Sequence, residues 1–263
     1  MRILFLGDIV GRPGRTAVKK HLASIRADVG ADLILANAEN ASGGLGLSAE
    51  GAKELLNAGL DVLTSGNHIW KFKDMPSYMG RESRLIRPAN YPPGLPGQGM
   101  FVLRKEGLPP VAVLNLLGRT FMPPVDCPFR VADALLTQVD TEAPDVKIRL
   151  VDFHAEATSE KAALGWHLDG RVSAVLGTHT HVQTADARLL KQGTAFITDL
   201  GMSGPIDSCL GMNVAPILRK FLTAAPERFE VADGPVALCG ALLDIDDTSG
   251  QAQSIAAWRF DAD

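Results

Sequence analysis

Two histidines separated by a single residue lie in the segment Gly177-Thr178-His179-Thr180-His181, directly after an apolar run at residues 172–176. Such a run is typical of a buried strand. In extended backbone, residues i and i+2 face the same side, so both imidazoles are expected to point into one region of space. Neutral imidazole is the commonest metal ligand in proteins. A surface loop with two solvated histidines would show the same short pattern, so the remaining polar residues must decide between the two.

Other side chains that can bind metals follow the ends of further apolar runs. They are Asp8 after residues 2–7, Glu39 and Asn40 after residues 32–37, Asn67 and His68 after residues 61–64, and His154 after residues 147–153. Each one alone fits a turn, a loop acid or a hydrogen-bonded histidine, but four coincident placements are hard to attribute to chance. Carboxylate, carboxamide and imidazole groups together suit manganese, iron or zinc. Two metals that share a carboxylate can activate a water molecule against a phosphoester.

The elements that must position these residues alternate between strand and helix. Residues 18, 22, 25 and 29 are apolar at helical spacing between the first two strands, and a second helix is expected from about residue 48 to 58. This order predicts parallel βαβ units, whose strands carry ligand sites at their carboxyl ends. Further helices are expected at residues 70–79, 131–139, 159–168 and 213–222, and hairpins at 100–104 with 111–116, at 187–197, and at 236–245 with 252–260. No linker divides the chain, so residues 1–263 are expected to form one domain.

Five motifs in order along the chain resemble those of the calcineurin-like metallophosphoesterases. They are Gly7-Asp8-Ile9-Val10-Gly11, Ala38-Glu39-Asn40, Gly66-Asn67-His68, His154, and Gly177-Thr178-His179-Thr180-His181. The longer strings at residues 7–14, 37–41, 153–161 and 177–186 resemble the YmdB-like branch of that superfamily. The resemblance implies an α/β fold, the calcineurin-like metallophosphoesterase sandwich of α/β/β/α layers with two mixed sheets flanked by helices. The later strands, mostly linked by hairpins, are expected to form the second sheet.

The chain departs from the usual superfamily pattern at two ligand positions. Val10 stands where a histidine is usual and Glu39 where an aspartate is usual; both are features of the YmdB-like branch, in which Asn40 would replace the lost histidine. The resemblance then implies Asp8, Glu39, Asn40 and His181 around one metal, and Glu39, Asn67, His154 and His179 around the other. His68 has no metal in this scheme and would be the general acid. Arg12, Arg119 and Phe121 could contact substrate, but such loop residues are more often solvated or packed, so we leave them out of the site.

The same resemblance implies a metal-dependent phosphodiesterase. It would open 2′,3′-cyclic nucleotides to 3′-nucleotides by attack of a metal-bridging hydroxide, with His68 protonating the leaving group. Two divalent or trivalent metal ions are implied, with iron expected and manganese as the alternative. A broad phosphomonoesterase or a nuclease is a rival enzyme, and a non-catalytic metal-binding regulatory protein is a rival of another class. The complete ligand set and His68 argue against the regulatory protein.

Composition narrows the partners and the compartment. With 26 basic and 30 acidic residues the net charge is −4, which gives little support to a nuclease groove or a stable nucleic-acid complex. The opening apolar run is too short for a signal peptide, and no stretch approaches the length of a membrane span. Three widely spaced cysteines fit a reducing cytoplasm. We therefore expect a cytoplasmic protein that acts on a small-molecule phosphodiester or cyclic nucleotide without a membrane, and the resemblance leaves room for a homo-oligomer.

Overall fold

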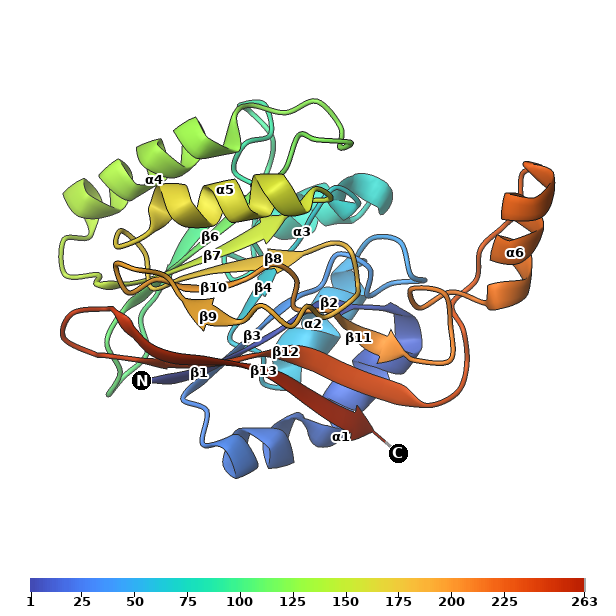
Figure 1. Cartoon of the computed structure of the whole chain (residues 1–263), viewed down its shortest axis with the longest axis horizontal. Coiled ribbons are helices and arrows are strands. Elements are labelled where there is room, and N and C mark those ends of the chain that lie inside the picture. The colour runs from blue at the N-terminus through green and yellow to red at the C-terminus, as the bar shows by residue number, and fades with distance from the viewer. Residues whose placement is uncertain (263) are drawn as a thin grey trace.

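The buried apolar runs of the sequence form two mixed β-sheets that pack face to face, with helices on both outer faces (Figure 1). The structure is a computed structural model that describes residues 1–262. The first sheet has the strand order β2 (Asp8–Ile9), β11 (Met202–Pro205), β12 (Val236–Ile245), β1 (Arg2–Leu6), β3 (Leu33–Asn37) and β4 (Val62–Thr64), and β13 (Ala252–Ala262) pairs with β12. Strands β1, β3 and β4 are parallel, as the βαβ pattern predicts.

The second sheet is parallel at its centre and antiparallel at both edges. Its order is β5 (Met100–Leu103), β6 (Val111–Leu117), β7 (Ile148–His154), β8 (Ala174–Thr178), β10 (Ala195–Ile197) and β9 (Arg188–Leu189). The expected hairpins β5–β6 and β9–β10 are present. Since β6, β7, β8 and β10 are parallel, their carboxyl ends meet at one edge, and β7 and β8 end there in His154 and Thr178.

Three apolar cores fill the spaces between the layers. Phe5 and Leu35 of the first sheet meet Leu150 and Leu176 of the second in the central core. The outer face of the first sheet is covered by α1 (Gly11–Val29) and α2 (Ala49–Asn57), and that of the second by α4 (Pro128–Glu142) and α5 (Thr158–Leu168). Periodic apolar residues such as Leu22 in α1 are fully buried there, which is why these segments form helices against the sheets. This arrangement confirms the predicted α/β/β/α class.

The last hairpin belongs to the first sheet, so the expectation that the later strands form the second sheet is wrong for β12 and β13. Strand β12 lies antiparallel beside β1, with Leu4 opposite Leu242. Its first six residues are all buried, which requires neighbours on both faces and both edges. Burial alone does not specify which sheet supplies those neighbours, and the hairpin pattern therefore could not predict the sheet.

The helix expected at residues 70–79 is in fact two short pieces. A 3₁₀ turn, η1 (Ile69–Lys71), is followed after a break by α3 (Met75–Met79). Pro76 stands in the first turn of α3, where a missing N–H is tolerated, and it could not continue a helix from the preceding turn. The helix expected at 213–222 is present as α6 (Val214–Thr223), but it stands away from the body of the molecule (Figure 1). Within residues 1–262, no helix is both long and apolar enough to cross a membrane.

Candidate metal centre

The predicted site residues come together at the carboxyl ends of strands from both sheets. Asp8 begins β2, Glu39 and Asn40 follow β3, Asn67 and His68 follow β4, His154 ends β7, and His179 and His181 follow β8. Their side chains are connected by a continuous set of short contacts. Asp8, Glu39 and His154 are fully buried, which is unusual for charged groups without a shared partner.

One half of the cluster centres on the His154 imidazole. Its Nε2 atom lies 3.0 Å from Glu39 Oε1, 3.2 Å from Asn67 Oδ1 and 3.0 Å from His179 Nδ1. One ligand atom from each of Glu39, His154 and His179 lies within 4.8 Å of the other two, so a single cation could contact all three. Together with Asn67 these are the residues that the resemblance assigns to one metal.

The other half contains Asp8, Asn40 and His181. Asp8 Oδ1 is buried without a hydrogen-bond partner among residues 1–262, and His181 Nε2 lies 3.9 Å from it. An unpaired buried carboxylate oxygen is costly, and a cation beside it would remove that cost. Asn40 presents its Nδ2 to His181 at 3.1 Å and its Oδ1 to His68 at 3.0 Å. Ligation through Asn40 therefore requires the amide turned by 180°, which exchanges oxygen and nitrogen in nearly the same volume.

The two histidines of the His-x-His pair do not lie in extended backbone, so that expectation is wrong. Strand β8 ends at Thr178, and His179 and His181 have positive φ angles of 103° and 67°. Left-handed backbone at such residues costs about 1–3 kcal/mol and persists only where surrounding contacts maintain it. One such contact is the His179 N–H, which donates to Asp8 Oδ2 at 3.0 Å. Because of the turn, His179 faces His154 whereas His181 faces Asp8 and Asn40.

The cluster is packed so tightly that one neighbouring position cannot carry a side chain. A Cβ atom on Gly66 would lie 2.2 Å from Glu39 Oε2 and 2.4 Å from His154 Nε2. Gly66 precedes Asn67 directly, so its backbone passes against both Glu39 and His154 on the way to the next predicted ligand. The glycine therefore allows the chain to bring Asn67 within reach of His154.

The pKa values of the cluster shift in both directions, according to the charges that face each buried group. Burial alone would lower the pKa of His154, but the Glu39 carboxylate outweighs it and raises the pKa to about 9. Burial, together with the charge on His154, lowers the pKa of His179 to about 3. Burial raises the pKa of Asp8, whereas the nearby imidazoles overcome burial and hold the pKa of Glu39 well below its ordinary value. A cation at this position would take over the role of the His154 proton.

A buried network that the sequence analysis missed orients His154. Asp152 on β7 is fully buried and accepts hydrogen bonds from Thr178 Oγ1 at 2.7 Å, from Asn37 Nδ2 at 2.8 Å and from Thr64 Oγ1. Since the Thr178 hydroxyl donates to Asp152, its oxygen is left to accept from His154 Nδ1, 2.9 Å away. His154 Nε2 then faces Glu39. Burial raises the pKa of Asp152 to about 6. The available signal was a carboxylate inside an otherwise apolar strand.

Two further contacts support the loop that carries His179 and His181. Glu156 Oε2 lies 3.1 Å from His179 Nε2, so His179 turns its Nδ1 toward the cluster. Lys161 and Asp199 form a buried ion pair at 2.7 Å, and Asp199 Oδ2 also accepts from the Thr180 N–H at 3.0 Å. The sequence analysis assigned neither partner to the site, although Asp199 lies two residues after β10, as Glu39 does after β3.

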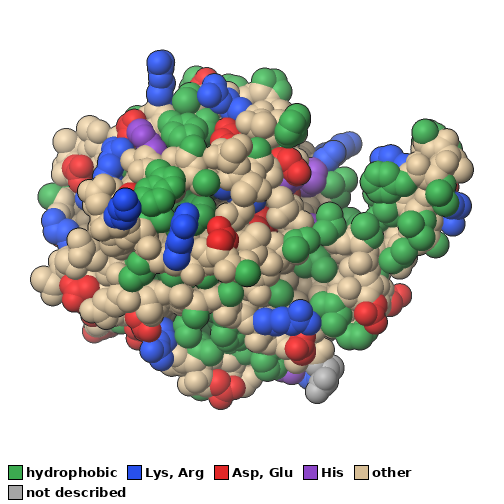
Figure 2. Space-filling view, in the orientation of Figure 1, with side chains coloured by type: hydrophobic (Ala, Val, Ile, Leu, Met, Phe, Trp, Pro, Cys, Tyr) green, Lys and Arg blue, Asp and Glu red, His purple; other side chains and the backbone are tan. Residues whose placement is uncertain are grey.

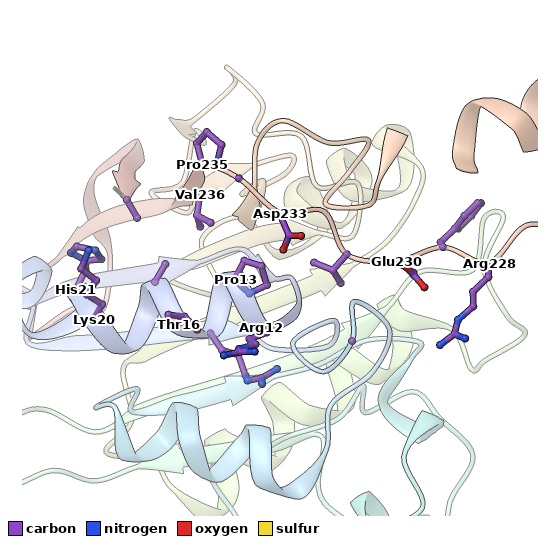
Figure 3. Close-up of a pocket in the computed structure, with 17 residues that line it drawn as sticks. Arg12, Pro13, Thr16, Lys20, His21, Arg228, Glu230, Asp233, Pro235 and Val236 are labelled. Carbon is purple, nitrogen blue, oxygen red and sulfur yellow. The ribbon is translucent and has the colours of Figure 1, made fainter. Parts of the chain in front are cut away.

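A large cavity lies away from this cluster. It has a volume of about 990 Å³ and lies between α1 and residues 228–236, where Arg12, Lys20 and Glu230 line it (Figure 3). None of the predicted metal ligands lines it. Arg12 therefore belongs to this cavity, and Phe121 is 90% exposed in its loop.

Two sheets in an α/β/β/α sandwich, with carboxylates, amides and histidines gathered at their strand ends, define a metallophosphoesterase. Within that class the chain belongs to the family described as YmdB-like protein, whose model matches residues 4–258. A 2′,3′-cyclic-nucleotide 2′-phosphodiesterase of Bacillus subtilis (strain 168) is 48% identical over 255 residues, 97% of this chain and 95% of its own.

Two solved structures have the same fold. A hypothetical protein from Thermus thermophilus matches with a TM-score of 0.92 and 41% identity, over 100% of both chains. A structure described as a novel phosphatase from Mycoplasma pneumoniae matches with a TM-score of 0.92 and 35% identity, over 100% of this chain and 94% of that one. These similarities extend over the whole sandwich, including every strand end that carries a predicted ligand.

Proposed function

We propose that this chain hydrolyses 2′,3′-cyclic nucleotides to 3′-nucleotides as a metal-dependent phosphodiesterase. The observation that carries the proposal is the position of Glu39, whose Oε1 lies 3.0 Å from His154 Nε2 and 3.1 Å from His68 Nδ1. The buried Glu39 carboxylate thus contacts both His154 and the partly exposed His68. The activity named for the Bacillus subtilis relative supports the choice of substrate class.

The residues fit a pair of metal ions that share this carboxylate. Asp8, Glu39, Asn40 and His181 would bind one ion, and Glu39, Asn67, His154 and His179 the other. The orphaned Asp8 oxygen and the absence of cysteine from the set suit iron, with manganese as the alternative. When bound, the ions supply a water of lowered pKa as nucleophile and neutralise the charge of the phosphate.

His68 is placed to act as the general acid. Its Nδ1 lies 3.1 Å from Glu39 Oε1, and its backbone N–H donates to Glu39 Oε2 at 3.1 Å, so the ring is fixed from one side. Its side chain is 25% exposed, and Nε2 has no protein partner among the described residues. That free nitrogen can deliver a proton to the leaving oxygen of the opened ring.

An activity panel on protein purified without chelator and loaded with manganese or iron tests the proposal. Bis-p-nitrophenyl phosphate and 2′,3′-cyclic AMP are the substrates, Asn67→Ala is the negative control, and chromatography identifies the nucleotide formed. We expect His68→Ala to retain its metals and lose about 10²–10⁴-fold in kcat. Wild-type activity no higher than that of Asn67→Ala with either metal would refute the enzyme, and loss of metal from His68→Ala would refute its role as acid.

A phosphomonoesterase is the second candidate, because one solved relative is described as a phosphatase. Turnover of p-nitrophenyl phosphate faster than that of every diester tested would favour it.

The three cysteines (Cys127, Cys209 and Cys239) are all unpaired, which supports the cytoplasmic location that we propose with the activity.

A further inference from the structure

The loop at residues 118–127 joins β6 to α4 and begins beside the predicted ligand His154 (Figure 1). Leu117, the last residue of β6, lies opposite His154 in the parallel pair with β7. The Gly118 N–H then donates to His154 O at 2.9 Å. A Cβ atom on Gly118 would lie 2.5 Å from that of Ala155, so the loop leaves its strand packed against the residue that follows His154. The first residues of the loop are therefore neighbours of the candidate metal centre.

The backbone of this loop is held at both ends. The Arg119 N–H donates to both carboxylate oxygens of Glu160, at 3.0 and 3.1 Å, and the Thr120 N–H donates to Glu160 Oε2 at 3.1 Å. At the far end, the Asp126 N–H donates to Asn90 O at 2.9 Å. These hydrogen bonds fix the path of the chain and use none of the loop's side chains.

Two large side chains near the start of the loop have no partner within the described part of the protein. Phe121 is 90% exposed and belongs to none of the three apolar cores, and the Arg119 guanidinium forms no hydrogen bond or ion pair within residues 1–262. Figure 2 shows hydrophobic side chains scattered among polar ones over one face of the molecule, so exposure alone does not distinguish Phe121. Its backbone and its position do.

The backbone at Phe121 is strained. Its φ angle is 62°, in the left-handed region that bulky residues rarely adopt. A turn in which the Met122 N–H donates to Arg119 O at 3.2 Å encloses this residue. Strain of this kind concentrates at functional sites, and the predicted ligands His179 and His181 have it as well. At Phe121 the strain presents an aromatic ring to solvent, where it gains no packing within the chain.

We propose that this loop binds the nucleotide at the metal centre, with Arg119 on the phosphate and Phe121 on the nucleobase; the inference rests on the proposed function. A guanidinium matches the oxygens of a phosphate. A phenyl ring stacks on any nucleobase, because every base has a π-face. A 2′,3′-cyclic nucleotide carries both groups on one ribose, so residues two apart in a single loop can contact both. Arg12 has no part in this subsite, since it lines the separate cavity beside α1.

Calorimetric titration of the manganese-loaded full chain with 3′-AMP and with inorganic phosphate tests the subsite without turnover. We expect wild type to bind 3′-AMP at least tenfold more tightly than phosphate. Phe121→Ala should weaken binding of 3′-AMP about tenfold more than that of phosphate. Arg119→Ala should weaken binding of both by about tenfold. Phe121→Trp keeps an aromatic ring and should retain most of the affinity for 3′-AMP.

Trp166→Ala is the matched control, because it also removes a partly exposed aromatic ring. The Trp166 ring lies on α5 beneath Arg188 of the edge strand β9, 5.7 Å from the guanidinium carbon, and is 48% exposed. Its loss should leave both affinities at the wild-type level. All the substituted side chains are exposed, so circular dichroism should show unchanged folding of each variant.

Turnover then separates this subsite from the proposed function. The kcat/KM of Phe121→Ala should fall about tenfold more for 2′,3′-cyclic AMP than for methyl riboside 2′,3′-cyclic phosphate, which lacks the base. Affinity of Phe121→Ala for 3′-AMP equal to that of wild type would overturn the subsite, and so would wild type that binds 3′-AMP no more tightly than phosphate. Wild type that binds 3′-AMP through Phe121 and hydrolyses no cyclic nucleotide would instead refute the proposed function and leave the subsite in place.

Discussion

Gly66→Ala adds a single methyl group beside the candidate metal centre and replaces none of its predicted ligands. The added Cβ would lie 2.2 Å from Glu39 Oε2 and 2.4 Å from His154 Nε2. Ordinary contact between such atoms needs about 3.5 Å. Either the backbone at residue 66 or both side chains must therefore move by roughly 1 Å.

That displacement would move predicted metal ligands, whose positions determine the geometry of the centre. Glu39 is expected to bind both metals, and the backbone that would move leads directly to Asn67. A misplacement of about 1 Å can cost about 10²-fold in rate, so we expect kcat of Gly66→Ala to fall by that order. Overpacking also costs about 1–3 kcal/mol of stability, which would lower the melting temperature without unfolding the chain at 25 °C.

Gly80→Ala is the matched control, because Gly80 has an ordinary φ of −68° and its Cβ would meet no atom closer than 3.7 Å. The assays are diester hydrolysis, metal content by mass spectrometry and thermal unfolding, measured on wild type and both variants. We expect Gly80→Ala to match wild type in all three. Full activity with a complete metal complement in Gly66→Ala would show that the cluster is looser than these distances imply.

Substitutions of residues that support the predicted ligands should affect metal affinity and stability separately. Glu156→Ala should weaken manganese binding by about 10–100-fold in a calorimetric titration, whereas Glu156→Gln, which keeps an acceptor for His179, should lose much less; equal affinity of Glu156→Ala and wild type would contradict that role. Asp199→Asn leaves a buried lysine unpaired and should cost about 3–5 kcal/mol in urea unfolding. Adding Lys161→Met should recover part of that loss, and no recovery would mean that the pair is not the source of the cost.

The sequence predicts the fold as far as local periodicity and strand order reach. Alternation of apolar strands with amphipathic helices identifies the parallel units and both short hairpins of the second sheet. It does not reveal that β12 inserts beside β1, because Leu4 and Leu242 meet across almost the whole chain. The break before α3 was readable from Pro76 alone, since proline cannot continue a helix from the turn before it.

The candidate ligands could be found because each follows the end of a buried strand, where a carboxylate or imidazole has few structural reasons to stand. The directions of the His179 and His181 side chains could not be predicted. Their positive φ angles depend on contacts such as the one between His179 and Asp8, which lies 171 residues away in sequence. Asp152 could be recognised from the sequence as a buried acid, but its partners could not. A carboxylate in a strand with both faces buried must be paired. Its partners here are Thr178 on the adjacent strand β8 and Asn37 and Thr64 on the facing sheet. Through Thr178 that pairing determines which nitrogen of His154 faces Glu39, and an outer partner of this kind typically changes metal affinity by about 10–100-fold.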